Sequence, residues 1–186
     1  MDSINKYEIK AWQMPRYKTH WRNICAILPV YLSDGSNGSQ VLFDAGSVEY
    51  VQARLSWVLN DFFSQWCSSK ALFLQRSQWI LQQLGYPYRR RLPLLVAEDL
   101  VLVPVKVRQP LSRNHGADGY VVLSKVIHIS AKENGTAIIL ENQNSIQVLD
   151  SLRTMRQNLK LAMALHIEME AKQYENRILS ITEATN

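Results

Sequence analysis

The sequence contains few of the residues that cross-link or interrupt small folds, with two cysteines, seven glycines and six prolines in 186 residues. Cys25 and Cys67 are far apart and form no Cys-x-x-Cys pair, which indicates neither a disulfide framework nor a cysteine-based metal site. We therefore expect two reduced thiols that act as small core residues, and no bound metal.

Long hydrophobic runs are also missing. No apolar stretch approaches the roughly 20 residues that a membrane-spanning helix needs. The first ten residues, MDSINKYEIK, lack the apolar region of a secretion signal. The sequence therefore predicts a cytoplasmic protein with no membrane partner.

Motifs for catalysis are absent as well. The chain has no GxSxG, P-loop, GxGxxG or HExxH pattern, and its four histidines are well separated in sequence. We expect a protein that is not an enzyme and that holds no cofactor. An enzyme acting on nucleic acids or nucleotides stays an alternative that a divalent-metal-dependent cleavage assay would detect.

Positive charge is concentrated in the middle third of the chain. Residues 1–64 carry six Lys/Arg and six Asp/Glu, and residues 126–186 carry six against seven. Residues 65–125 carry nine against three, so this third contains the whole excess of the net charge of +5. A concentrated basic stretch indicates a polyanionic partner, although a locally basic surface without a partner remains an alternative.

Hydrophobic periodicity predicts strands, then two helices, then strands and a last helix. Pro104 suggests that the segment 100–107 is an edge strand or contains a bulge, because proline donates no ladder hydrogen bond. Ser47 is expected to cap the first long helix. The strands are expected at 6–12, 25–32, 40–45, 92–97, 100–107, 120–130, 136–141 and 145–150, and the helices at about 48–67, at 71–84 and from 152 onward.

The predicted fold class is α+β, with a mostly antiparallel sheet, two consecutive central helices and a long C-terminal helix. Residues 1–179 would form a single DNA-binding domain, and residues 180–186 a frayed tail. The last helix is too long to serve only as a cover for the sheet. We expect it to pack against a partner subunit as well as its own domain.

The basic residues of the middle third are the candidate site. If the two central helices pack beside the strands at 92–107, these residues would converge on one ridge suited to nucleic acid. Arginine fits this role because its planar fork contacts phosphates and enters the narrow minor groove of A/T-rich DNA. The candidate DNA contacts are Arg76, Arg89, Arg90, Arg91, Lys106, Arg108 and Arg113.

Several segments between Val41 and Leu159 resemble the ComK family of competence transcription factors. The stretch PLLVAEDLVLVPV (93–105) is similar to that family's PPI-v-D…ifFPT segment, and GYVV (119–122) to its aromatic-led strand. Asp150-Ser151-Leu152 resembles the Asn-Ser-Leu start of the family's last helix. Cys67, Phe73 and Arg76 stand where the family has a cysteine, an aromatic residue and an arginine. The family's FGSSY-x-GR motif is replaced by ALFLQR (71–76), which has lost the glycines.

The resemblance implies a sequence-selective transcriptional activator of competence genes that binds A/T-rich double-stranded promoter DNA through the minor groove. It further implies a homo-oligomer, either a dimer or a tetramer, and turnover through an adaptor of a Clp-type protease. The alternative is a protein-interaction module whose basic surface and C-terminal helix hold an acidic partner.

Overall fold

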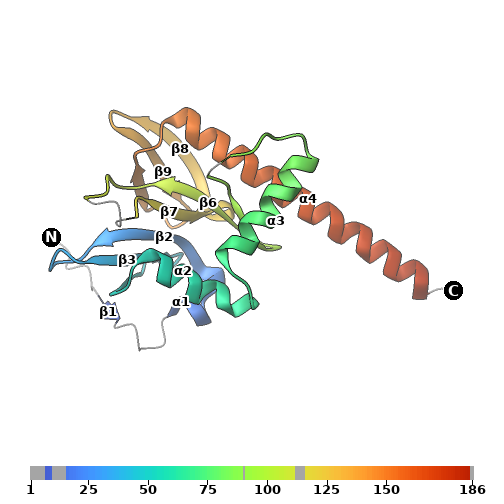
Figure 1. Ribbon diagram of the computed structural model, residues 1–186, viewed down its shortest axis with the longest axis horizontal. Coiled ribbons are helices and arrows are strands. Elements are labelled where there is room, and N and C mark those ends of the chain that lie inside the picture. The colour runs from blue at the N-terminus through green and yellow to red at the C-terminus, as the bar shows by residue number, and fades with distance from the viewer. Residues whose placement is uncertain (1–6, 10–15, 90, 112–115, 185–186) are drawn as a thin grey trace.

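The computed structural model describes residues 7–9, 16–89, 91–111 and 116–184, and its α+β architecture is drawn in Figure 1. The predicted fold class is confirmed, because antiparallel sheets combine with two consecutive helices in mid-chain and a long C-terminal helix. The elements of the first half are β1 (Tyr7–Ile9), α1 (Arg16–Thr19), η1 (Trp21–Asn23), β2 (Ile24–Tyr31), β3 (Asn37–Phe43), β4 (Val48–Val51), α2 (Leu55–Phe63), η2 (Ser64–Trp66) and α3 (Lys70–Gln83).

The second half of the chain completes one sheet and forms another. The larger sheet has seven strands in the order β1-β4-β3-β2-β7-β6-β5, all antiparallel except the β1–β4 pair. The smaller sheet, β10-β9-β8, is the predicted meander. The remaining elements are β5 (Leu94–Ala97), β6 (Leu100–Lys106), β7 (Asp118–Val122), η3 (Leu123–Lys125), β8 (Val126–Lys132), β9 (Gly135–Leu140), β10 (Ser145–Val148) and α4 (Leu152–Ala184).

Strand β6 shows why the sequence contains a nearly continuous apolar run. Val101, Val103 and Val105 pack into one core cluster, whereas Leu100 and Leu102 pack into a second. Successive side chains of a strand point to opposite faces, so a strand that is covered on both faces must be apolar at almost every position.

The two core clusters are filled by different helices. Phe62 and Phe63 of α2 belong to one cluster, and Leu165 of α4 belongs to the other. Helix α3 contributes to both, with Phe73 in the cluster of α2 and Ile80 in that of α4. The strands at the centre of the larger sheet therefore lie between two apolar layers.

The predicted helix at 48–67 is wrong at its start. Val48–Val51 form the strand β4, which pairs with β3 across a turn in which Gly46 has φ +76°. Ser47 consequently caps no helix, and α2 begins only at Leu55. Cys67, expected in the core, is exposed and has a left-handed φ of 50°.

The predicted strand at 120–130 is also wrong as a single element. The one-turn helix η3 divides it, so that β7 joins the larger sheet and β8 the smaller one. Lys125 fixes this break because its ammonium pairs with Glu141 at 2.9 Å and with Asp44 at 3.7 Å. The Glu141 amide in turn donates to the carbonyl oxygen of Lys125.

The expectation that Pro104 marks an edge strand is wrong for β6 as a whole, which lies between β7 and β5. Its pairing with β5 covers only Leu100 to Leu102, however, so Pro104 lies beyond the end of β5. The carbonyl oxygen of Pro104 accepts a hydrogen bond of 3.1 Å from the Asn158 side chain of α4. Proline is tolerated here because β5 offers no partner for an N–H group.

Helix α4 begins as predicted, with the Ser151 hydroxyl accepting from the Thr154 amide. At about 1.5 Å per residue its 33 residues span roughly 50 Å. Its first half packs on the sheets, and its second half extends away from the rest of the molecule (Figure 1). The helix continues to Ala184, past the boundary at 179 expected from the sequence.

Candidate nucleic-acid interface

The structure describes five of the seven predicted DNA contacts. Arg90 and Arg113 lie outside the described residues. The other five come from α3, from the segment that follows α3, and from the end of β6 and the residues just after it. Their partners determine which of them are available to a ligand.

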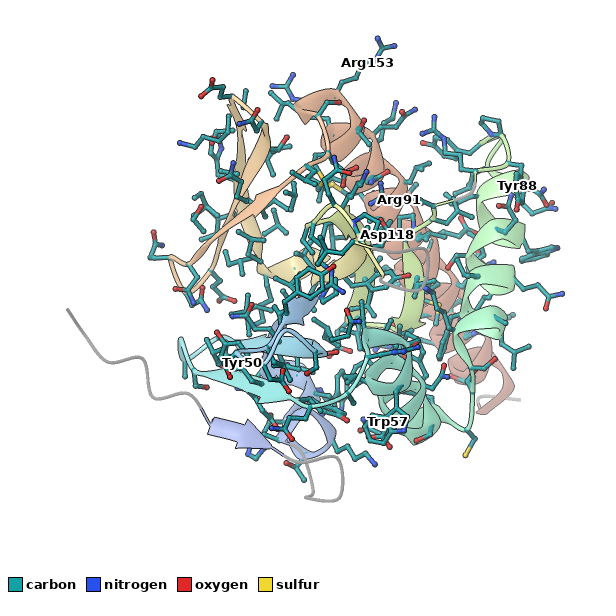
Figure 2. The ribbon with its side chains drawn as sticks, turned by 60° about the vertical axis from the view of Figure 1, so that its left-hand side comes forward. Tyr50, Trp57, Tyr88, Arg91, Asp118 and Arg153 are labelled. Carbon is teal, nitrogen blue, oxygen red and sulfur yellow. The ribbon has the colours of Figure 1, made fainter. Side chains whose placement is uncertain are left out.

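Arg91 is bound to carboxylates of the protein itself. Its two Nη atoms donate to the two oxygens of Asp150 at 2.8 and 3.2 Å, and it also pairs with Asp118 at 3.2 Å. Although burial opposes the charge, the hydrogen bond to Asp150 and the two nearby carboxylates raise the pKa of Arg91. Figure 2 shows Arg91 beside Asp118 at the centre of the molecule. Because its charge is already balanced, we leave Arg91 out of the interface.

Arg108 is fixed at the end of the sheet. Its Nε donates to the Gly116 carbonyl oxygen and its Nη2 to Asn37 Oδ1, both at 2.8 Å. The guanidinium also stacks on Tyr31, 4.0 Å from the ring centroid. Burial lowers the pKa of Arg108, but the group stays charged because arginine does not lose its proton in proteins.

Arg76 and Arg89 belong to a different part of the surface. Arg76 is exposed on α3, and its Nη2 approaches Met169 Sδ of α4 at 3.4 Å. Arg89 follows α3 and lines a hollow of about 210 Å³ with Gln75 and Gln78. Among the described residues, no ion pair, hydrogen bond or pocket joins Arg76 or Arg89 to Lys106 or Arg108. The predicted convergence of all these groups on one ridge therefore has no direct contact behind it, and it stays a prediction.

Two further cations, absent from the sequence prediction, lie beside Arg108. Arg54 immediately precedes α2, and Lys70 is the first residue of α3. Both line a pocket of about 330 Å³ together with Arg108 and one carboxylate, Asp118. We call Arg54, Lys70, Lys106 and Arg108 the basic end. Lys106 belongs to it because Lys106 of β6 pairs with Asp118 of β7, and Asp118 lines the pocket.

The sequence contained a signal for Arg54 that depended on the helix boundary. Arg54 lies in residues 1–64, where positive and negative charges are equal in number. The distribution of charge along the sequence therefore does not indicate Arg54 as a DNA contact. A helix that starts at Leu55 places Arg54 at the position before the first helical turn, next to the partial positive charge of the helix dipole. The incorrect start at 48 hid this placement.

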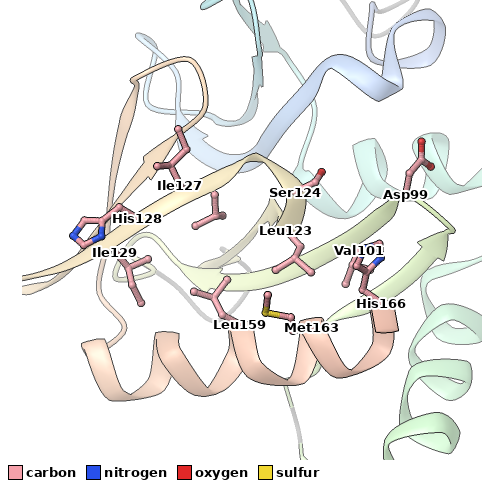
Figure 3. Close-up of a pocket in the computed structure, with 11 residues that line it drawn as sticks. Asp99, Val101, Leu123, Ser124, Ile127, His128, Ile129, Leu159, Met163 and His166 are labelled. Carbon is pink, nitrogen blue, oxygen red and sulfur yellow. The ribbon is translucent and has the colours of Figure 1, made fainter. Parts of the chain in front are cut away.

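A second and larger pocket has a different character. It has a volume of about 480 Å³ and lies between β8 and α4 (Figure 3). Ile129 of β8 points across it toward Leu159 and Met163 of α4, whereas Ile127, which also lines the pocket, points away from α4. Its walls are largely apolar, so we do not include it in a nucleic-acid interface.

Within the part of the chain that the structure describes, no three His, Cys, Asp or Glu side chains are grouped to hold a metal ion. No helix in that part has the length and apolar content needed to cross a bilayer.

Comparisons with known proteins found no match to this chain among family models, curated proteins or solved structures. The resemblance to the ComK family thus rests on the sequence segments alone, and it remains a prediction.

Proposed function

We propose that the protein is a sequence-selective, double-stranded DNA-binding transcriptional activator of competence genes, with A/T-rich promoter sites as its target. The resemblance to the ComK family supplies the class of target. The structural support is the basic end, where four cations from three segments of the chain lie near the point at which β6 ends and β7 begins. A cytoplasmic location follows from this proposal.

Lys70 and Lys106 would act as phosphate contacts, because ammonium groups bind the backbone as point charges without reading sequence. The guanidinium of Arg54 suits the narrow, strongly negative minor groove of A/T-rich DNA. Phosphate contacts should dominate the affinity and make it fall steeply as salt rises.

Fluorescence anisotropy with an A/T-rich and a G/C-rich duplex tests the proposal at salt concentrations between about 50 and 200 mM, where phosphate contacts are usually measured. We expect tighter binding of the A/T-rich duplex and a negative dependence of log K on log salt. The double variant Lys70→Gln/Lys106→Gln should flatten that slope by roughly two. Arg153→Gln, on the first turn of α4 and away from α2 in Figure 2, is the control. Absent binding, or equal binding of both duplexes, contradicts the proposal.

The exposed side of α4 supports a second copy of the chain as a partner. Ile167 and Tyr174 are 60% and 68% exposed, whereas Leu161 and Leu165 are buried. At 3.6 residues per turn, the exposed pair lies on the helix side opposite to the buried pair. We propose that this exposed apolar side packs against the same side of a second α4 in a two-fold dimer.

Light scattering on the purified protein tests this assembly. Ile167→Glu/Tyr174→Glu should convert a dimer to a monomer, whereas Gln157→Glu, an exposed polar position of α4, should leave the dimer intact. A monomeric parent protein contradicts the assembly. A different protein that co-purifies in stoichiometric amount, without DNA binding, would instead favour an interaction module.

A further inference from the structure

Helix α2 begins without a side-chain cap. Its N-cap residue is Arg54, in extended geometry, and the Arg54 side chain makes no capping hydrogen bond. Arginine has no acceptor atom and cannot perform this role. The amides of Trp57 and Val58 donate to the Arg54 carbonyl oxygen. The amides of Leu55 and Ser56 have no acceptor among the described residues, so the start of α2 offers two free donors and the positive end of its dipole.

These two residues line the pocket of about 330 Å³ at the basic end. Three cations line the same pocket. Arg54 directly precedes Leu55, Lys70 comes from the start of α3, and Arg108 comes from the segment after β6. Three cations from three separate segments thus share one cavity with the start of a helix. A basic surface that only faces solvent does not need a cavity between its cations.

Arg108 brings a fixed guanidinium to the same pocket. Its contacts to Gly116, Asn37 and Tyr31 hold the guanidinium in one orientation. Among the residues that the structure describes, its Nη1 nevertheless has no hydrogen-bond partner. A buried donor without a partner lowers stability, and an acceptor oxygen of a ligand would remove that cost.

One carboxylate also lines the pocket and acts against an anion. This is Asp118, whose Oδ1 pairs with Arg91 at 3.2 Å. Three cations and one carboxylate leave the lining side chains with a net charge of +2. Because part of the negative charge of Asp118 is balanced by Arg91, the pocket favours a dianion.

We propose that the pocket formed by the start of α2, Lys70 and Arg108 is a binding site for a single phosphate group. The phosphate can belong to a DNA backbone, in which case the inference rests on the proposed function, or to a small phosphorylated ligand. Phosphate fits because its tetrahedral oxygens accept from helix amides and from cations on different sides.

Titration with inorganic phosphate, against chloride at matched ionic strength, tests the site by amide NMR. We expect saturable shifts of the Leu55 and Ser56 signals and a rise in Tm with phosphate concentration. Arg54→Gln/Lys70→Gln should weaken phosphate binding by at least about tenfold, and Lys70→Arg should retain it. Arg153→Gln should behave as the parent. Shifts that do not saturate, or that are equal in the double variant, show an adventitious ion only and overturn the proposal.

A duplex titration distinguishes the two sources of phosphate. If DNA occupies the pocket, an A/T-rich duplex should move the same two amide signals and displace inorganic phosphate. If the duplex does not bind but inorganic phosphate does, the site stands for a small ligand and the proposed function fails. If the duplex binds while Leu55 and Ser56 respond to neither probe, the proposed function stands and the site does not exist.

Discussion

Arg91 and Asp150 form a bidentate ion pair, with Arg91 Nη1 and Nη2 at 2.8 and 3.2 Å from the two carboxylate oxygens. Only 6% of the Asp150 side chain is exposed. The same carboxylate accepts from the backbone amide of Lys106 at 2.6 Å. The pair therefore connects the segment that follows α3 to the end of β6 and to the residues that precede α4.

Replacing Arg91 should destabilise the fold without weakening DNA binding. Arg91→Met leaves the carboxylate of Asp150 buried with a backbone donor as its main partner. We expect a loss of about 2–3 kcal/mol in the free energy of unfolding, the range of a charged hydrogen bond at a partly exposed pair. Urea unfolding measures the loss, and duplex anisotropy on the folded variant should match the parent. Reduced DNA affinity with unchanged stability would return Arg91 to the interface.

Gly135 opens β9 in a conformation that only glycine adopts easily, with φ +132°. A Cβ at this position would overlap the carbonyl oxygen of Val148 in β10. Gly135→Ala must therefore move backbone, and we expect a loss of about 2–3 kcal/mol. Gly116→Ala is the matched control, because among the described residues its Cβ would meet no atom within 4 Å. Equal thermal denaturation curves for the two variants would contradict this prediction.

Glu49 should make the protein less stable as pH rises. Glu49 is 2% exposed, and burial raises the pKa of its carboxyl group. The hydrogen bond from the Arg16 amide and the charge of Arg16 lower this pKa, but burial has the larger effect. Between the unfolded glutamate pKa, about 4.3, and the raised folded pKa, the folded state holds more proton than the unfolded chain. Its contribution to stability is therefore fully present below about pH 4.3 and is lost as pH rises through the folded pKa.

Glu49→Gln removes this pH dependence. Relative to the parent, the variant should gain about 1.4 kcal/mol for each unit by which the pKa of Glu49 is raised, as pH goes from acid to neutral. Urea unfolding of both proteins across that range measures the change. Glu98→Gln, at an exposed position, is the matched control. A parallel pH dependence of the parent and Glu49→Gln would exclude Glu49 as the cause.

Glu49 also explains why part of the fold could not be predicted. In β4 the buried positions are Glu49 and Val51, which are two residues apart as a strand requires. A buried glutamate hides this alternation, and Val48, Val51 and Leu55 then match helical spacing as well. By contrast, the meander of β8, β9 and β10 was predictable, because its turns contain asparagine and glycine between apolar runs.

The candidate site was less predictable than the fold for a related reason. In the sequence, three consecutive arginines have the same chemistry, and nothing local separates Arg91 from Arg89. The distinction comes from Asp118 and Asp150, which only the folded chain brings to Arg91. In the same way, Arg54 and Lys70 gain their position from the folding of α2 and α3 against the end of the sheet.

The two cysteines should differ sharply in reactivity, although both were expected to be core residues. Cys25 is fully buried, and burial raises its pKa to about 11. Since the thiolate is the nucleophile, at pH 8 roughly one Cys25 in a thousand is reactive, and its burial also excludes the reagent. Cys67 is exposed. Iodoacetamide should therefore modify one thiol in the native protein and two in urea, as read by intact mass. The Cys67→Ser variant in its native state should remain unmodified. Rapid alkylation of that variant would contradict the prediction, because it would mean that the Cys25 thiol in β2 is accessible to the reagent.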